Sequence, residues 1–285
     1  MRPQPSAHWD RIITHKSGLF DLRLKELIKY KDLLFLLVRR DFVSFYKQTA
    51  LGPVWFFIQP MFTTFVYVFI FGTLAQISTD GISQPVFYLS GIIAWSYFSE
   101  CVIKTSNVFR DNAGIFGKVY FPRLVMPLSI VISNLVKLGI QLLLLIVVIT
   151  FYEIMGQNAF NPTIYLLALP FLVLLLAVMG LGFGMIVSSV TTKYRDIGFL
   201  VSFAMPLLMY ATSVVYPLSS VTGNLKMLIL INPMTPVIEG FRIGLFGQGE
   251  FGFYSLLYLT VFSAVILMCG TLIFNKVQKD FVDTV

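Results

Sequence analysis

Six apolar stretches, each long enough to cross a lipid bilayer as a helix, follow one another along the chain between short polar segments. The first, 54–75, has no charged residue and would extend about 33 Å as a helix, which exceeds the bilayer core of about 30 Å. The other five stretches lie at 86–109, 124–151, 164–190, 197–216 and 252–274. The pattern predicts an all-α integral membrane protein with six transmembrane helices.

A different periodicity precedes the first span. Apolar side chains recur at helical spacing on one face of 32–47, at Leu34, Val38, Phe42 and Phe45, while Arg39, Arg40 and Lys47 lie largely away from that face. This is typical of an interfacial helix with its apolar side in lipid and its basic side toward anionic headgroups. An ordinary soluble amphipathic helix would show the same spacing. We favour the interfacial helix, because Gly52-Pro53 ends the periodicity and a span begins there.

The segment 217–250, before the last span, is rich in Gly and Pro, yet it contains apolar patches at 227–231 and 237–246. Two short re-entrant helices that meet near Asn232-Pro233 would fit this pattern. Such helices require protein or water to cover the exposed backbone. A folded extracytoplasmic loop fits the pattern equally well.

Composition excludes a soluble globular protein, since 57% of the residues are hydrophobic, 12% are charged and the mean hydropathy is +0.82. The net charge of +7 comes mainly from the N-terminal arm and short loops on one side, whereas the opposite side has only Lys226 and Arg242. Membrane orientation explains this charge without nucleic-acid binding, and it places both termini in the cytoplasm. We expect a cytoplasmic arm (1–53), a membrane domain (54–274) and a cytoplasmic tail (275–285).

Charged residues inside the spans are costly and therefore informative. Glu100 and Lys104 are four residues apart and are predicted to form a structural pair on one helix face. Lys137 has no carboxylate at helical spacing, so it is the stronger functional candidate unless a neighbouring helix supplies a partner. Gly180, Gly184 and Ser188 predict a helix packing face in the fourth span.

No catalytic constellation stands out, so we expect no enzymatic activity, no metal and no cofactor on this chain. Both histidines, His8 and His15, lie in the polar arm. Gly117-Lys118 resembles the end of a phosphate loop, but Val119 replaces the required Ser or Thr. The chain is not expected to hydrolyse nucleotide.

Two spans combine polar groups and aromatic rings in a way that would suit a carbohydrate path. Rings can pack on the C–H faces of sugars, and hydroxyls offer exchangeable hydrogen bonds. Packing or lipid-facing aromatics are the alternative for any single ring, since the chain has 28 Phe. The candidate lining residues are Gln59, Phe62, Thr63 and Tyr67 in the first span and Phe199, Phe203, Tyr210 and Ser213 in the fifth.

Several short motifs follow one another along nearly the whole chain: Tyr46-Lys47-Gln48-Thr49, Leu51-Gly52-Pro53-Val54-Trp55, Gln59-Pro60, Phe116 to Arg123, Tyr194-Arg195-Asp196, Tyr216-Pro217-Leu218-Ser219, and Asn232-Pro233-Met234 with Glu239 and Arg242. In this order they resemble the permeases of bacterial type-2 ABC polysaccharide exporters. That family includes O-antigen, capsule and teichoic-acid exporters, and the O-antigen permeases are the most similar branch. Each motif is weak alone, and together they are specific.

The resemblance implies a homodimer in the bacterial inner membrane, joined to two separate ATPase subunits that hold ATP and Mg²⁺, and exporting a lipid-linked polysaccharide. It implies that 32–47 and the loop 110–123 meet the ATPase and that 217–250 forms gate helices. Arg39 and Arg40 are candidates for guiding the pyrophosphate of the lipid carrier. The candidate coupling residues are Arg110, Phe116, Lys118, Tyr120 and Arg123, and the candidate outer-gate residues are Asn232, Glu239 and Arg242.

Three other functions remain open at this stage. A type-2 permease for a drug or small lipid would share the architecture. An integral-membrane acyltransferase would need a His or carboxylate cluster at a membrane face, and the sequence shows none. A secondary transporter often contains an internal repeat, and none is evident.

Overall fold

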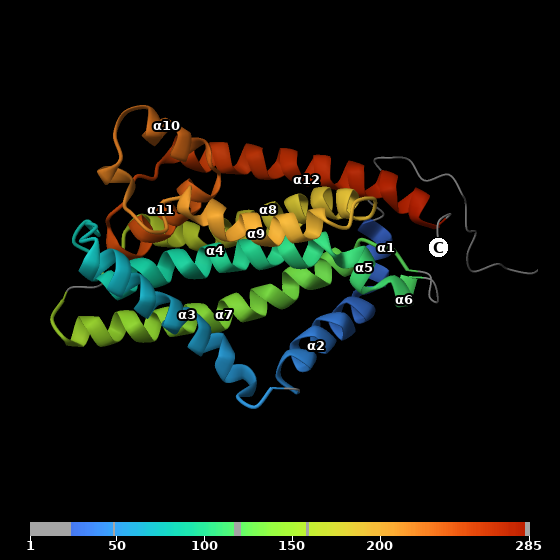
Figure 1. Cartoon of the computed structure of the whole chain (residues 1–285), viewed down its shortest axis with the longest axis horizontal. Helices are drawn as coiled ribbons and strands as arrows, with labels where there is room; N and C mark the ends of the chain where they lie inside the picture. The colour runs from blue at the N-terminus through green and yellow to red at the C-terminus, as the bar shows by residue number, and fades with distance from the viewer. Residues whose placement is uncertain (1–23, 48, 117–120, 158–159, 283–285) are drawn as a thin grey trace, which may run out of the picture.

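The structure is a computed structural model that describes residues 24–47, 49–116, 121–157 and 160–282. It is about 80% helix, and the described residues contain no strand. The long helices lie side by side in an elongated bundle (Figure 1). The prediction of an all-α integral membrane protein is confirmed.

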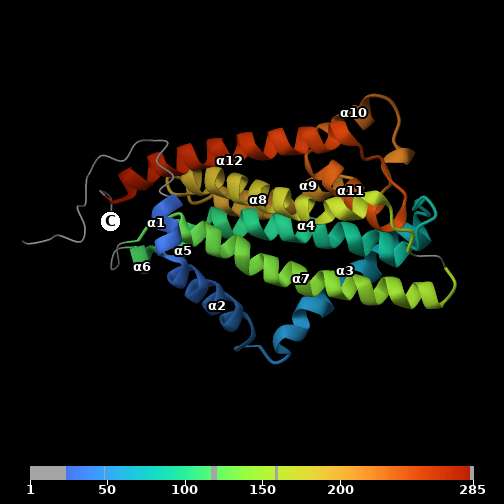
Figure 2. The same cartoon turned by 180° about the vertical axis from the view of Figure 1, so that it is seen from behind.

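The helices have the following bounds, in chain order: α1 (Leu24–Lys29), α2 (Lys31–Lys47), η1 (Gly52–Val54), α3 (Trp55–Tyr67), the π-helical η2 (Val68–Leu74), α4 (Gln84–Ser106), α5 (Val108–Asp111), α6 (Ala113–Phe116), α7 (Val125–Ile154), η3 (Ile164–Ala168), α8 (Leu169–Thr191), α9 (Ile197–Tyr210), η4 (Leu218–Ser220), α10 (Gly223–Ile231), α11 (Met234–Phe246) and α12 (Phe253–Val282). One end of the bundle, called the terminal end here, holds α1, α5, α6 and the C-terminal end of α12, and α10 and α11 lie at the other (Figures 1 and 2).

Five helical stretches are long and apolar enough to cross a membrane, and they match the first, second, third, fourth and sixth predicted spans. Their bounds are Gly52–Leu74, Gln84–Ser106, Val125–Ile154, Ile164–Thr191 and Phe253–Val277. The segment before the last span is not an irregular loop. It forms α10 and α11, two short apolar helices bent by 94°, called the bent pair here, and this geometry agrees with the re-entrant alternative.

The fifth predicted span is shorter than expected, because its helix α9 has 14 residues and ends at Tyr210. The chain then turns inward, and Thr212, Ser213 and Val214 are fully buried. Gly91 of α4 makes room for this turn, since a Cβ atom there would lie 3.2 Å from Val214 Cγ1. Packing of the turn against α4 therefore replaces the last turns of the predicted helix.

Close packing around α8 confirms the predicted ridge of small residues. A Cβ atom added at Gly180 would lie 2.8 Å from Cys101 Cβ, and one added at Gly184 would lie 2.5 Å from Thr105 Cβ, so the ridge faces α4. On another side of α8, a Cβ atom at Gly270 of α12 would lie 2.6 Å from the carbonyl oxygen of Gly182. Small residues thus bring α4 and α12 into near-backbone contact with α8.

The amphipathic helix α2 forms as predicted, but part of its apolar face contacts protein instead of lipid. Leu37 is buried, Leu34 packs against the core, and the ring of Phe42 stacks on that of Phe56 with 6.0 Å between centroids. This correction has a simple cause, since α2 packs along α7. The side chain of Phe45 lies outside the described residues.

Candidate functional site

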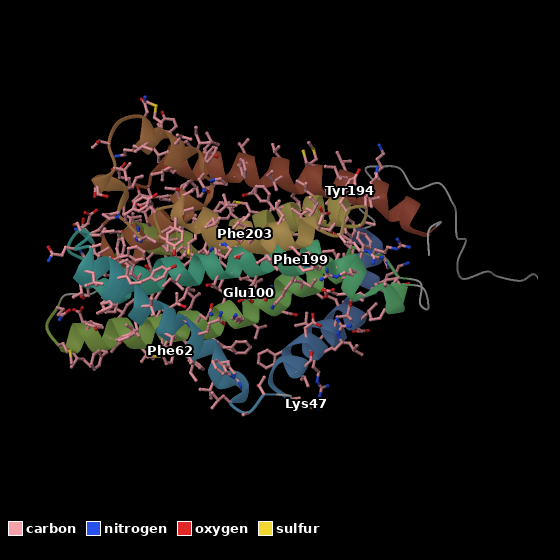
Figure 3. The ribbon with its side chains drawn as sticks, in the orientation of Figure 1. Lys47, Phe62, Glu100, Tyr194, Phe199 and Phe203 are labelled. Atoms are coloured by element: carbon pink, nitrogen blue, oxygen red, sulfur yellow. The ribbon has the colours of Figure 1, made fainter. Side chains whose placement is uncertain are left out.

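The aromatic residues predicted to line a path form an exposed surface over α3 and α9. Phe62 of α3 is 67% exposed, and Phe199 and Phe203 of α9 are 74% and 71% exposed. Figure 3 shows these three side chains, and both helices lie on the side that faces the viewer in Figure 1 and away from the viewer in Figure 2. Together with Phe65 and Phe69, they are called the aromatic face below.

Polar groups interrupt the aromatic face on α3. Trp55, Ile58, Gln59, Phe62 and Thr63 line an open hollow of about 450 Å³. The Thr63 hydroxyl donates a hydrogen bond of 3.0 Å to the Gln59 backbone carbonyl. The Gln59 side-chain amide takes no part in this bond, and it is placed to contact a molecule in the hollow.

Two of the predicted lining residues, Tyr67 and Ser213, are buried within the single chain. The Tyr67 hydroxyl donates to Met209 Sδ at 3.7 Å, and its ring meets Phe71 and Tyr88 edge-on. Ser213 belongs to the turn that packs against α4. Both side chains therefore pack where α3, α4 and α9 meet. Tyr210, beside them, is 46% exposed.

A charged cluster lies between α4 and α7. The predicted pair is confirmed, with Lys104 Nζ 3.2 Å from Glu100 Oε2. Lys137, buried on α7, also donates to Glu100, so a neighbouring helix supplies the carboxylate that its own helix lacks. Asn134 completes the cluster, since its Oδ1 accepts from Lys104 Nζ at 2.9 Å. Sequence reasoning missed Asn134, although its spacing of three from Lys137 places both on one helix face.

A second buried pair ties the bent pair to the bundle. Arg242 Nη1 lies 3.2 Å from Glu239 Oε1, and both side chains are only 2% exposed. Arg242 also donates to the Val214 carbonyl at 3.0 Å, and its guanidinium lies 3.6 Å from the centroid of the Phe87 ring. Glu239 Oε2 accepts from the backbone N–H of Glu250 at 3.0 Å. The pair therefore joins α11, α4, the turn after α9 and the approach to α12.

The third outer-gate candidate, Asn232, lies apart from this pair, at the bend between α10 and α11. Its Oδ1 accepts from the Met234 N–H at 3.0 Å, which satisfies a free donor in the first turn of α11. Its Nδ2 donates to the Ala211 carbonyl at 3.2 Å. Asn232 thus fixes the bend against the end of α9.

The predicted headgroup residues lie on the exposed side of α2. Leu36, Arg39, Arg40, Val43 and Lys47 line an open hollow of about 360 Å³. Arg40 pairs with Asp41 at 2.8 Å, and both side chains are partly exposed. Basic heads beside apolar side chains suit the boundary between lipid headgroups and acyl chains.

The described start of the predicted coupling loop, in α5 and α6, lies near α1 at the terminal end of the bundle (Figures 1 and 2). Arg110 pairs with Asp111 at 3.2 Å on the surface. Partial burial lowers the pKa of Arg123 below its usual value. Lys118, Tyr120 and the side chain of Phe116 lie outside the described residues.

Comparison with known families shows to which family the chain belongs. The sequence profile described as "ABC-2 type transporter" matches residues 32–246, more than half of the chain. The chain belongs to the ABC-2 type transporter family. The match to the ABC-2 profile runs from α2 to the end of α11, and it therefore includes the aromatic face and both buried charge clusters.

Several ABC-2 relatives align over nearly their whole length. The O-antigen export system permease protein RfbA of Myxococcus xanthus is 27% identical over 264 residues, covering 92% of this chain and 98% of the relative. An RfbA of Klebsiella pneumoniae is also 27% identical, with the same coverage of both chains. The polysialic acid transport protein KpsM of Escherichia coli is 25% identical, covering 84% of this chain and 91% of the relative.

The described part of this ABC-2 chain contains no group of three or more His, Cys, Asp or Glu side chains placed to hold a metal ion. The charged side chains that lie inside the bundle are engaged in the two clusters described above. What the fold presents is an exposed aromatic surface over α3 and α9 and two clusters of paired charges.

Proposed function

We propose that this chain is the membrane permease of an ABC exporter that moves a lipid-linked polysaccharide across the bacterial inner membrane. The observation that carries the proposal is the end-to-end similarity to permeases named for O-antigen export and polysialic acid transport. The exposed aromatic face supports it, because rings and scattered polar groups can follow a sugar chain without holding one unit tightly.

The path itself requires a second copy of the chain. In a homodimer, the aromatic faces of two chains would oppose one another, and α3 and α9 of each would enclose the glycan. The exposed Phe62, Phe199 and Phe203 would then line a shared channel. Large exposed apolar surfaces in a membrane chain can also face lipid, so dimerisation decides which role they have.

Energy would come from two ATPase subunits, which would hold ATP and Mg²⁺. The terminal end of the bundle is the proposed docking surface for them, with α1, α2 and the loop 110–123 as its elements. The excess of basic residues near that end supports a cytoplasmic location for it and for both termini. The segments 1–53 and 275–285 would then be the cytoplasmic arm and tail around the membrane domain 54–274.

Co-purification of the tagged chain from its native membrane, followed by an ATPase assay with added lipid-linked glycan, tests this function. We expect a stoichiometric ATPase partner and a turnover that rises with the glycan. A partner that responds to small lipids or drugs, and not to glycan, would assign the chain to another substrate class. Recovery of the chain without an ATPase in mild detergent would overturn the exporter assignment.

Replacing Phe199 and Phe203 with alanine is expected to reduce glycan export by tenfold or more without lowering thermal stability. Both rings are more than 70% exposed, so their removal leaves no cavity in the folded chain. Surface glycan, detected by immunoblot, and the unfolding temperature in detergent are the two measurements. Phe253 at the start of α12 is 73% exposed and does not belong to the aromatic face, so Phe253→Ala should leave export unchanged. Equal losses in both variants would contradict a glycan path over α9.

The double variant Arg39→Ala, Arg40→Ala is expected to slow export by up to about thirtyfold while the chain still assembles. Loss of two basic heads weakens attraction to an anionic carrier at the membrane surface by about 1 kcal/mol for each residue. Export rate in membrane vesicles at low and high salt measures the effect, which should shrink as salt screens the charges. Unchanged export would remove α2 from carrier recognition.

A further inference from the structure

The exposure of α4 changes abruptly along its length. Every residue from Val86 to Trp95 is buried. Beyond Trp95, the positions that are not buried recur at helical spacing and form one stripe down the helix toward the terminal end. The stripe consists of Ser96, Ser99, Glu100, Ile103, Lys104 and Asn107, of which only Ile103 is apolar. This polar stripe is unexpected on a helix whose span is 78% buried.

The polar stripe lies between α7 and α9. On one side, Glu100 and Lys104 contact Lys137 and Asn134 of α7. On the other side, a Cβ atom added at Gly198 of α9 would lie 2.8 Å from Asn107 Oδ1. Figure 3 shows Glu100 on the same side of the bundle as Phe199 and Phe203. The stripe therefore runs beside the aromatic residues of α9, and its last residue, Asn107, lies next to the start of that helix.

The cluster at this stripe carries an uncompensated positive charge. Two ammonium groups, on Lys104 and Lys137, share the single carboxylate of Glu100. In the described part of the chain, no other carboxylate forms an ion pair with either lysine. The side chain of Lys137 is 10% exposed, whereas that of Lys104 is 49% exposed. The excess charge is therefore accessible at Lys104.

Two hydrogen bonds hold the Lys104 ammonium in place and leave one of its N–H groups for a ligand. Of its three N–H groups, one donates to Glu100 and one to Asn134 at 2.9 Å. No acceptor for the third lies among the residues that the structure describes, so this N–H group can donate to a ligand that approaches from the exposed side. Lys137 also holds the Glu100 carboxylate in place. The Lys104 ammonium is therefore already ordered before a ligand binds.

We propose that Lys104 binds a phosphate oxygen of the lipid carrier, with Glu100, Asn134 and Lys137 positioning its ammonium, at the terminal end of the glycan path. A charge inside a bilayer is costly unless it has a partner or a functional ligand, and lysine binds phosphate as a point charge. The inference rests on the proposed function. It differs from recognition at α2, because it places the anion against the exposed stripe of α4, beside the aromatic residues of α9.

Binding of a polyprenyl diphosphate to the purified full-length chain in nanodiscs tests the proposal. We expect Lys104→Gln, which keeps a hydrogen-bond donor but removes the charge, to weaken binding about tenfold. Lys104→Arg should keep most of the affinity. Glu100→Gln should strengthen binding, because it leaves the cluster with two uncompensated ammonium groups. Lys226→Gln, at the opposite end of the bundle, is the matched control and should change nothing.

Further binding measurements identify the source of the phosphate and separate this inference from the exporter assignment. Competition by inorganic diphosphate would show that the free anion suffices, and its absence would show that the site takes the lipid-linked group. Uncharged polyprenol should bind all variants equally. Equal diphosphate affinity in wild type, Lys104→Gln and Lys226→Gln, or no binding to wild type, would overturn the site. The exporter assignment would then still stand or fall on the ATPase experiment.

Discussion

Gly270→Ala is expected to lower the unfolding free energy by about 3 kcal/mol or more and to reduce the yield of monodisperse protein several-fold. The new Cβ atom would lie 2.6 Å from the carbonyl oxygen of Gly182 and 3.1 Å from its Cα. Backbone atoms cannot rotate away as a side chain does, so α8 and α12 must move apart. Overpacking typically costs about 1–3 kcal/mol, and here it occurs where backbone meets backbone.

Gly139→Ala is the matched control, because Gly139 lies on the exposed side of α7 and nothing is within 4 Å of a Cβ atom there. Alanine is favoured over glycine in a helix by about 1 kcal/mol, so this variant should be as stable as wild type or more so. Thermal unfolding in detergent and size-exclusion chromatography measure both variants. Equal stability of the two alanine variants would show that α12 is not locked against α8 at Gly182.

Arg242→Met is expected to destabilise the chain by about 3–5 kcal/mol, since it leaves the Glu239 carboxylate buried without its partner. Methionine keeps most of the side-chain volume, so the effect reports the charge and its hydrogen bonds more than a cavity. The lost interactions are those with Glu239 and with the Val214 carbonyl. Urea or thermal unfolding in a mild detergent provides the measurement.

Two comparisons identify the cause of that loss. Adding Glu239→Gln to Arg242→Met removes both charges and should restore part of the stability, because an unpaired buried charge costs more than a missing pair. Arg40→Met breaks a partly exposed pair with Asp41 and should cost no more than about 1 kcal/mol. If Arg242→Met proved no worse than Arg40→Met, the buried pair would not hold the bent pair to the bundle.

The helices and the class of protein could be predicted from sequence because both depend on local patterns. Long uncharged runs require helices in a membrane, where every backbone polar group must be satisfied within the segment. The same reasoning identified the i, i+4 contact between Glu100 and Lys104 and the small-residue ridge at Gly180 and Gly184. Each of these features involves residues a few positions apart on a single helix.

Contacts between distant segments were beyond this reasoning. The partner of Lys137 comes from another helix, and so does the surface that covers Leu37 of α2. The inward turn after Tyr210 depends on the absence of a side chain at Gly91, which no local periodicity reveals. For the same reason, Tyr67 and Ser213 were assigned to a path by their chemistry, although neighbouring helices bury them.

The two halves of the bent pair differ in their freedom to move. Nearly every residue of α11 is buried, and its Glu239–Arg242 pair joins it to α4, whereas α10 contains no buried residue. The α10 segment is attached through a few surface contacts, including Lys226 with Glu250 and the Tyr258 hydroxyl with the Ile231 carbonyl. Segments with few buried contacts open at low free-energy cost. If this end of the bundle widens, α10 is therefore expected to move first, while α11 stays packed against α4.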